Sequence, residues 1–364
     1  MIQIAKPQID IAEIKSVSKV LLNGQLSSGR YVKEFEKLFK QYIGSKYAIA
    51  TCNGTAALHT ALLAVGISTG DNVITTPFSF IATANAIRLI GGNPIFADID
   101  EDSFNIDPKK IELEIKESKE RIKAMVIVHL FGKACNMNEI KSICDKYEIL
   151  LIEDCAQAHG AEYNNQKVGT FGAASIFSFY PTKNMTCGEG GIILTNSKEI
   201  YEKSKLIINH GQNSRYNHTI MGYNYRMTDI AAAIGIEQLK KLEEFNHKRI
   251  QNAKAYFRDI DNPSICLPHV DENSKHVFNQ FTIKCKNRIS LINHLDLNNI
   301  GYGIYYPNII PNQPLYKSIG FNKKYKNAEA VCQSVISLPV HPSLEQFELK
   351  RIIDTLNSYE YNPS

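Results

Sequence analysis

Residues 171–196 read FGAASIFSFYPTKNMTCGEGGIILTN, two strand-like apolar runs with a single lysine, Lys183, in the loop between them. Gly188, Gly190 and Gly191 follow the lysine, and glycines let a backbone come close to a bound group. A lone loop lysine is most often a solvated surface residue. The glycines beside Lys183 favour instead a loop that is built around a ligand.

The first 230 residues alternate strand-like runs with helical patterns. Strand-like runs occupy residues 46–52, 71–77, 93–100, 121–132 and 148–154, and residues 54–67, 79–92 and 138–147 have helical patterns. Short, almost uniformly apolar strands are typical of a mostly parallel sheet that helices cover on both faces. We therefore expect an α/β fold that binds its ligand at the carboxyl edge of the sheet.

The remaining residues indicate a second, smaller unit. A long amphipathic helix is expected over 230–257, strands over 276–285 and 301–309, and helices over 289–301 and 347–357. A chain of 364 residues has room for two domains, because single cores stop growing at roughly 250–300 residues. We predict a large α/β domain over 1–235 and a small α+β domain over 236–364.

Composition excludes several classes of function. The net charge is +4, from 41 Lys and Arg against 37 Asp and Glu, which is too small to indicate nucleic-acid binding by itself. Polar residues or glycines interrupt the apolar stretches well before membrane-spanning length. Eight scattered cysteines form no C-x-x-C pair, and no basic-then-apolar leader precedes them. We expect a cytoplasmic protein with reduced thiols and no metal site.

Three strand ends carry residues suited to a cofactor. Asp154 ends one strand, although an aspartate there also suits a turn or a helix N-cap. Another strand is followed by a turn with Gly54 and a helix that opens on Thr55 and Ala56, and such helix starts bind phosphate, although many helices begin this way without a ligand. Ser178 would touch the same phosphate or be a satisfied strand hydroxyl.

An acid, a phosphate seat and a lysine at neighbouring strand ends are the parts that pyridoxal phosphate requires. The lysine forms a Schiff base with the cofactor, and the acid keeps the pyridine nitrogen protonated. An aromatic ring is expected to cover the cofactor, and Phe80 is placed to do so. The alternative for both Phe78 and Phe80 is packing in the core.

Three further stretches, taken together, resemble one enzyme family. EDCAQAHGA (153–161), FSFYPTKNMTCGEGG (177–191) and GYNYRMTDIAAAIGIEQL (222–239) resemble the DegT-type nucleotide-sugar aminotransferases, which have the aspartate-aminotransferase-like fold type I. The resemblance extends from IAKPQIDIAEIKSV (4–17) and the loop NGQLSSGRYVKEFE (23–36) to SLPVHPSL (337–344). It implies a pyridoxal-5′-phosphate-dependent transferase.

The resemblance also implies roles for single residues. Lys183 would form the Schiff base, Asp154 would bind the pyridine nitrogen, and Gln157 would lie near the ring hydroxyl. The phosphate would be held by Gly54, Thr55, Ala56 and Ser178, and Phe80 would stack on the ring. Asn224 would reach the phosphate of the neighbouring subunit's cofactor, which implies a homodimer with shared active sites.

The implied reaction transfers an amino group from L-glutamate to a keto group on a nucleoside-diphosphate sugar, in the biosynthesis of amino sugars for surface glycans. A branch of the family that replaces the lysine with histidine dehydrates its substrate, and Lys183 argues against that branch. Other possibilities are a ligand-sensing protein without turnover or another fold type I enzyme. An amino-acid aminotransferase would need a small-domain arginine, and beyond residue 290 the chain offers only Arg351.

Several motif positions have no assigned role at this level. His159 suits a hydrogen-bonded structural residue more than a catalytic one, and the role of His129 is open. IYYPNIIPNQP (304–314) departs from the family pattern, with Tyr305 and Pro311 at positions that are often histidine. Tyr305, Tyr306 and Asn308 are candidates for lining the sugar-nucleotide channel.

Overall fold

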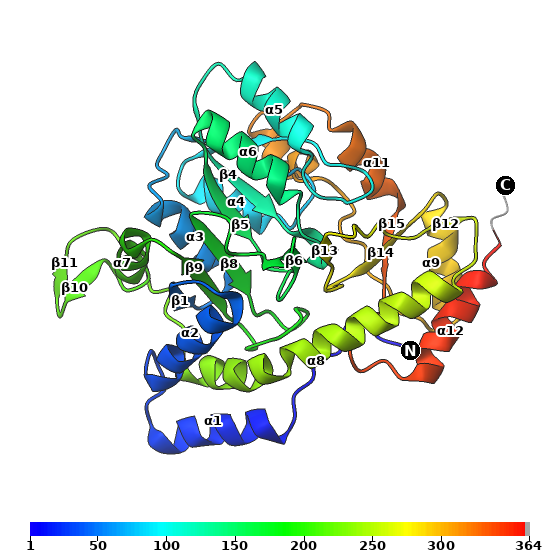
Figure 1. The fold of residues 1–364 in the computed structure, drawn as a ribbon, viewed down its shortest axis with the longest axis horizontal. Coiled ribbons are helices and arrows are strands. Elements are labelled where there is room, and N and C mark those ends of the chain that lie inside the picture. Colours follow the sequence, from blue (N-terminus) through cyan, green and yellow to red (C-terminus); the bar gives the residue numbers. More distant parts are fainter. Residues whose placement is uncertain (361–364) are drawn as a thin grey trace.

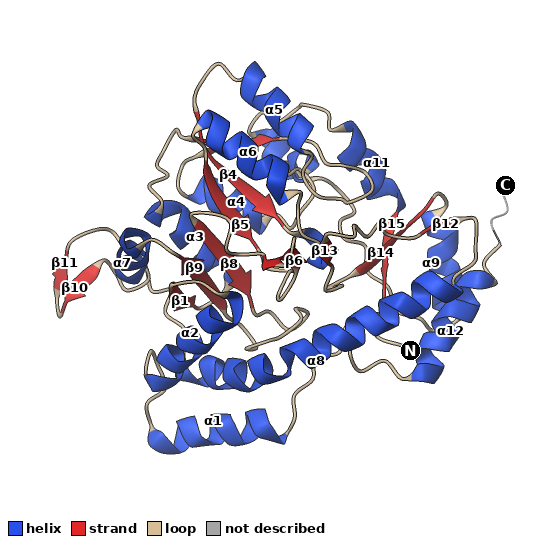
Figure 2. Ribbon diagram, in the orientation of Figure 1, coloured by secondary structure: helices blue, strands red, loops and turns tan. Residues whose placement is uncertain are grey.

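A computed structural model describes residues 1–360, and its centre is a seven-stranded sheet (Figures 1 and 2). The strand order is β1 (Tyr47–Thr51), β9 (Gly191–Thr195), β8 (Ala174–Ser178), β5 (Leu150–Asp154), β4 (Ile122–Val128), β2 (Asn72–Thr75) and β3 (Asn93–Phe96). Only β9 runs antiparallel to its neighbours. The predicted mostly parallel sheet is confirmed.

Alternate strand residues point to two different cores, because successive side chains of a strand lie on opposite faces. Ala48 and Ile192 join a core that includes residues of α2 (Arg30–Ile43) and α6 (Met137–Tyr147). Ile49 and Ile193 join a core that includes residues of α3 (Gly54–Ala64) and α4 (Ala82–Leu89). Helices therefore cover both faces, as the apolar strands predicted.

Two N-terminal helices were not predicted, although the sequence carries their signals. Helix α1 (Ile11–Asn23) begins at a capping box formed by Asp10 and Glu13. Helix α2 begins at Arg30, within the stretch that we expected to be a loop, and buries apolar residues at helical spacing: Val32, Phe35, Phe39 and Ile43. A capping box and a 3.6-residue period were sufficient to find both.

Helix α8 (Asp229–Asp259) is one continuous helix of 31 residues that runs along the molecule (Figure 1). Its first half contributes Ala232 and Leu242 to the sheet core, and its second half contributes Ala253 and Tyr256 to a separate core. The predicted boundary between residues 235 and 236 falls inside this helix, so the two-domain division stays a prediction.

The second core surrounds a small antiparallel sheet in the order β12 (Ile265–Cys266), β14 (Phe281–Cys285) and β15 (Val335–Leu338). Helices α9 (Arg288–Leu297) and α12 (Gln346–Asn357) pack there, which confirms the expected α+β character. The predicted strand at 276–285 begins only at Phe281.

The strand predicted over residues 301–309 is wrong. Within that stretch only Gly303 forms an isolated bridge, to Ser337. The aromatic pattern there comes from Tyr305 and Tyr306 packing against the cluster that contains Phe78, and Pro307 has no N–H to donate to a ladder.

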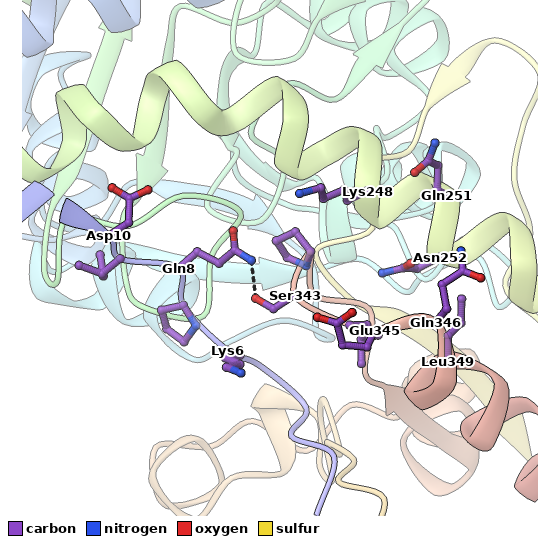
Figure 3. A pocket seen from close by; sticks show the side chains of 14 residues that line it. Lys6, Gln8, Asp10, Lys248, Gln251, Asn252, Ser343, Glu345, Gln346 and Leu349 are labelled. Carbon is purple, nitrogen blue, oxygen red and sulfur yellow. Dashed lines mark hydrogen bonds between the residues drawn. The ribbon is translucent and has the colours of Figure 1, made fainter. Parts of the chain in front are cut away.

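The N-terminal segment packs into the second core and then follows the surface beside α8. Ile2 forms a parallel bridge with Ile300 and belongs to the second core. Further along, Gln8 Nε2 donates to Ser343 Oγ at 2.5 Å, and this bond crosses a surface groove between residues 6–10, α8 and residues 342–349 (Figure 3). None of the residues that line this groove is a predicted site residue.

The other elements are short or peripheral. The β10–β11 hairpin (Gln212–Ser214 and Asn217–His218) extends away from the body (Figure 1). The remaining elements are α5 (Pro108–Glu117), α7 (Lys198–Ile207), α10 (Pro314–Ser318), α11 (Lys326–Ser334), β6 (Glu162–Tyr163), β7 (Gln166–Lys167), β13 (Ser274–Lys275) and the 3₁₀ turns Leu130–Gly132 and Ile310–Asn312. All eight cysteines are free thiols. Among the described residues, no helix is long and apolar enough to cross a membrane.

Candidate active site

The predicted site residues meet at the carboxyl edge of the large sheet. Asp154 is the last residue of β5, Ser178 is the last residue of β8, and Lys183 follows β8 in the loop before β9. Gly54 opens α3, just after β1. Because β1, β8 and β5 run in the same direction in this sheet, their ends place these residues along one edge.

Asp154 is buried and held by two donors. Thr83 Oγ1 donates to Oδ2 at 2.9 Å, and the Ala156 N–H donates to Oδ1 at 3.1 Å. Burial raises the pKa of the Asp154 carboxyl, while both hydrogen bonds and the charge of Lys183 act in the opposite direction. The Ala156 bond shows that Asp154 also shapes its turn, so the turn alternative describes part of its role. A buried carboxylate at this edge suits a cationic partner.

Lys183 is half-buried in its loop, which places its amine in a poorly solvated setting. Burial lowers the pKa of Lys183 to about 8, and the nearby charge of Asp154 acts against this shift. Its backbone N–H donates to the Tyr180 carbonyl at 2.9 Å. A lysine with this pKa loses its proton near pH 8, whereas a solvated surface lysine keeps its proton until about pH 10.

The start of α3 packs directly against Ser178. A Cβ atom on Gly54 would lie 2.7 Å from Ser178 Cβ, so only glycine lets the helix approach the strand end this closely. Asn53 caps α3, and its Oδ1 already accepts the Ala56 N–H at 2.8 Å. The amides of Gly54 and Thr55 belong to the first helical turn and have no carbonyl partner within the helix. These two amides and the Ser178 hydroxyl form a seat for an anion.

The two phenylalanines considered for covering the cofactor differ in burial. Phe78 is fully buried, with its ring 6.3 Å from that of Phe131, so the core-packing alternative is correct for it. Phe80 is 58% exposed, and its ring lies 6.4 Å from that of Tyr306. An aromatic ring left exposed at the carboxyl edge is available to cover a flat ligand.

Comparison with known proteins identifies this arrangement. A family model described as the DegT/DnrJ/EryC1/StrS aminotransferase family matches residues 7–357. The chain belongs to this family. The dTDP-3-amino-3,6-dideoxy-alpha-D-galactopyranose transaminase of Aneurinibacillus thermoaerophilus is 37% identical, over 95% of this chain and 95% of the relative. The GDP-perosamine synthase of Caulobacter vibrioides is 36% identical, over 98% of this chain and 97% of the relative.

A solved structure supports the fold and the cofactor together. NtdA from Bacillus subtilis with its bound cofactor pmp, pyridoxamine phosphate, matches with a TM-score of 0.88 and 32% identity, over 96% of this chain and 82% of that one. The predicted family, fold type and cofactor are confirmed, and the protein is a pyridoxal-phosphate-dependent sugar aminotransferase. The buried Asp154, the Lys183 amine and the Gly54–Ser178 contact fit that cofactor.

Gln157 of this aminotransferase is held at both ends of its amide. Its Oε1 accepts the Phe131 N–H at 2.8 Å, and its Nε2 donates to Tyr306 Oη at 3.1 Å. The second hydrogen on Nε2 remains to meet a ligand oxygen. Tyr306 therefore lies at the cofactor side of the site, and its contact with Gln157 gives it a more definite position than the sequence indicated.

The residues of the 304–314 segment differ in what they contact. Asn308 Nδ2 donates to the Asn312 carbonyl at 3.2 Å, which occupies this side chain in a local turn. Pro311 is buried in its 3₁₀ turn, and Tyr305 is half-buried. Arg351 is exposed on α12 and donates to the Asn298 carbonyl at 2.7 Å, in agreement with its expected solvated position.

Glu153, next to Asp154, belongs to a buried network that the sequence did not reveal. Its carboxylate accepts the N–H groups of Gly169, Phe171 and Gly172 at 2.7–2.8 Å and lies 3.1 Å from His129 Nε2. The Cys135 N–H donates to His129 Nδ1, so the proton of that ring sits on Nε2. His129 therefore has a structural role. Glu153, His129 and Cys155 lie close enough to bind a metal, but these hydrogen bonds already occupy the carboxylate, and we assign no ion.

His159 is fully buried against Phe177 and Phe179, with ring centroids 5.3 and 5.6 Å away. Burial lowers the pKa of His159 to about 3, so the ring is neutral. We expected a hydrogen-bonded structural histidine, but only its burial agrees with that expectation, because neither ring nitrogen has a hydrogen-bond partner of normal geometry among the described residues. Its carbonyl accepts a hydrogen bond from Asn246 Nδ2 at 2.8 Å.

Asn224 lies on the surface of the chain. Its backbone pairs with Asn209, and the carbonyl of the next residue, Tyr225, accepts the Cys52 N–H at 2.8 Å. The segment that carries Asn224 thus runs beside the strand that leads into the phosphate seat. A role for its exposed side chain at another subunit's cofactor stays a prediction.

Proposed function

We propose that this aminotransferase moves the amino group of L-glutamate to the keto carbon of a sugar linked to a nucleoside diphosphate. Glutamate leaves as 2-oxoglutarate, and the product is a nucleotide-linked amino sugar for surface glycans or related glycoconjugates. The observation that carries the proposal is that Lys183 and the buried Asp154 lie close enough at the sheet edge for each charge to shift the pKa of the other, in a chain whose relatives are named for nucleotide-linked amino sugars.

Lys183 is proposed as the residue that binds the cofactor and carries the proton. When bound, pyridoxal phosphate supplies an electron sink for charge that develops on the substrate carbon. Nζ of Lys183, once free, takes the proton from the α-carbon of the donor and returns a proton in the second half of the reaction. Its pKa of about 8 suits both tasks near neutral pH, because neither the charged nor the neutral amine is then scarce.

Asp154 is proposed to hold the pyridine nitrogen in its protonated form. Thr83 fixes one carboxylate oxygen and the Ala156 N–H fixes the other, so the carboxylate has one orientation. The negative charge of Asp154 is poorly solvated in its buried position, and a cationic ring nitrogen would compensate it. The charged carboxylate of Asp154 is therefore more stable when the cofactor is bound than when it is absent.

The other contacts to the cofactor are proposed from their place around these two residues. The phosphate is assigned to Gly54, Thr55, Ala56 and Ser178, with Ala56 sharing its amide with Asn53. Gln157 is assigned to the ring hydroxyl, and Phe80 to the face of the ring. Asn224 is assigned to the phosphate in the partner subunit, which makes the working unit a homodimer with shared sites.

One relative is named for a dTDP-linked sugar and another for a GDP-linked one, so the test below uses a panel of nucleotide sugars. We propose a cytoplasmic location, because the cysteines are free thiols and the composition is typical of a soluble protein.

The presence of both Lys183 and Asp154 argues against a ligand-sensing protein without turnover.

The test supplies the substrates and detects the product by mass. Purified protein with pyridoxal phosphate, ¹⁵N-labelled L-glutamate and a panel of 3-keto and 4-keto nucleotide sugars should yield a ¹⁵N-labelled amino sugar and an equal amount of 2-oxoglutarate. Lys183→Ala should yield neither, and Lys350→Ala, which changes an exposed lysine on α12, should behave as wild type. 2-Oxoglutarate without an amino sugar would contradict the proposed acceptor class.

A further inference from the structure

Three buried asparagines surround the loop that carries Lys183. Asn184 directly follows the lysine and is 3% exposed. Asn246, on α8, is 1% exposed, and Asn279, in the segment before β14, is 3% exposed. A carboxamide buried this completely is costly unless its donors and acceptor are paired. Three buried carboxamides around one loop therefore indicate that their side chains are hydrogen-bonded to one another or to the backbone of the loop.

The asparagines bond to one another and to the backbone on both sides of Lys183. Asn184 Nδ2 donates to Asn246 Oδ1 at 2.7 Å and to the Val277 carbonyl at 3.0 Å. Asn279 Nδ2 donates to Asn184 Oδ1 at 2.9 Å and to the Thr182 carbonyl at 3.4 Å. The residues before and after Lys183 are therefore both tied to this amide cluster, which consists of Asn184, Asn246 and Asn279.

The cluster connects the loop to elements that are distant in sequence. Asn246 Nδ2 donates to the His159 carbonyl at 2.8 Å, which reaches the turn after Asp154 and Gln157. Asparagine is a weak helix former, because its side chain competes for backbone hydrogen bonds. Asn246 lies in the middle of α8, and its side chain bonds to Asn184 and to the His159 carbonyl and not to the backbone of its own helix.

The segment that carries Asn279 also reaches the Gln157 side of the site. Val277 N–H donates to the Gly132 carbonyl at 3.0 Å, and Gln280 N–H donates to the Phe131 carbonyl at 3.2 Å. The Phe131 N–H in turn holds Gln157. The same short segment thus contacts the loop of Lys183 and the turn that orients Gln157, and it continues into β14 of the second core.

We propose that Asn184, Asn246 and Asn279 are positioning residues that fix the backbone on both sides of Lys183 and so set where its amine lies. The cluster acts through Lys183 and touches no substrate. The inference rests on the proposed role of Lys183 as the cofactor-binding lysine, but the geometry of the cluster is independent of any ligand.

A merely structural role for the cluster predicts a different result. If the amides only stabilise the fold, their loss lowers the melting temperature without changing the surroundings of the lysine. If they position the lysine, their loss lets the loop move and lets water reach the amine. Burial is what lowers the pKa of Lys183, so added water would move that pKa back toward the ordinary lysine value.

The experiment measures Lys183 in the apoprotein, without any turnover. The protein is treated briefly with trinitrobenzenesulfonate across pH 6–11, and the modified fraction of Lys183 is read by peptide mass spectrometry. Wild type should show a midpoint near pH 8. Asn184→Ala and Asn279→Ala should raise that midpoint by about one pH unit or more, since desolvation accounts for shifts of this size.

A matched control separates positioning from stability. Asn262 lies beside the second core. Its Nδ2 donates to the carbonyls of Leu356 and Tyr359, and its Oδ1 accepts the Ser264 N–H. Asn262→Ala should lower the melting temperature but leave the labelling midpoint of Lys183 at the wild-type value. The proposal is overturned if the cluster variants melt lower with an unchanged midpoint, or if Asn262→Ala raises the midpoint equally.

The experiment still gives a result if one variant does not fold or if the cofactor does not bind. If Asn184→Ala does not fold, Asn279→Ala still tests the proposal, because it leaves the Asn184 to Asn246 bond in place. If wild-type protein fails to bind pyridoxal phosphate through Lys183, the proposed function fails while the labelling comparison still judges the cluster. The failures of the two proposals can therefore be told apart.

Discussion

The Thr83 hydroxyl donates a 2.9 Å hydrogen bond to Oδ2 of Asp154, and both residues are buried. Thr83 comes from α4 and Asp154 from the end of β5, so the bond joins two elements across the carboxyl edge. It favours the charged carboxylate, which is the form that a protonated pyridine nitrogen requires.

Removing this hydroxyl should weaken the cofactor site more than the fold. Thr83→Val keeps the size of the side chain but removes the donor, and a hydrogen bond to a charged group is worth about 1.5–3 kcal/mol. We expect amination rates to fall roughly ten- to hundredfold, with cofactor affinity reduced and the melting temperature lowered by only a few degrees. Thr83→Ser should retain most of the activity. Equal rates for wild type and Thr83→Val would show that the bond has no part in catalysis.

Lys183 should destabilise the folded apoprotein at neutral pH. Its folded pKa of about 8 lies below the ordinary lysine value, so the unfolded chain binds more protons between about pH 8 and 10.4. Stability should therefore rise with pH across that window. Lys183→Met should melt at a higher temperature than wild type at pH 7, and the difference should shrink as pH approaches 10.4.

The matching control for this comparison is an exposed lysine. Lys350→Met should change the melting temperature by a small amount that does not depend on pH in this window. The pH dependence itself, recorded by calorimetry of the apoprotein, is the decisive quantity. A difference between Lys183→Met and wild type that stays constant from pH 7 to 10.4 would mean that burial does not perturb this amine.

Glu153 should matter for stability rather than for chemistry. Its carboxylate accepts three backbone N–H groups and lies against His129 Nε2, and it is fully buried. Glu153→Gln would turn an amide N–H₂ toward these donors, and breaking a buried charged network costs about 3–5 kcal/mol. We expect a large drop in the denaturant midpoint of the variant. Glu34→Gln, at an exposed position of α2, should not shift it. A Glu153→Gln protein as stable as wild type would refute the role assigned to this network.

The sharing of active sites between subunits can be tested by mixing two inactive variants. Asn224→Ala should be inactive at limiting pyridoxal phosphate, because binding of the cofactor phosphate is weakened, and Lys183→Ala should abolish turnover. If Asn224 serves the partner's cofactor, a mixed dimer contains one intact site. Random reassembly of equal amounts should then restore about a quarter of the wild-type activity, since half of the dimers are mixed and each has one working site. No recovery in mixed dimers, isolated through a different affinity tag on each variant, would place Asn224 in its own subunit's site.

The large sheet could be predicted from the sequence because its strands are buried on both faces and read as short apolar runs. The strand-end residues followed from that sheet, since parallel strands deliver their ends to one edge. The same reasoning failed at 301–309, where aromatic side chains pack into a cluster of rings and the backbone pairs with β15 only at Gly303. Pattern alone does not separate a strand from a loop whose rings are buried.

Contacts between distant segments were beyond the sequence for a different reason. The sequence around Thr83 or His129 does not indicate a carboxylate partner, because Asp154 and Glu153 are distant in the sequence. The order of the strands in the sheet brings these residues together. The bond between Gln157 and Tyr306 spans an even greater separation. The start of helix α1, by contrast, could have been predicted from the capping box that Asp10 and Glu13 form.

The visible absorption spectrum of the purified protein with pyridoxal phosphate tests the central claim most directly. Wild type should show the band of lysine-bound cofactor, and L-glutamate should bleach it, while Lys183→Ala should lack the band or ignore the donor. A wild-type protein without the band would contradict the role of Lys183 and Asp154. A band that persists unchanged in glutamate would contradict the proposed amino donor.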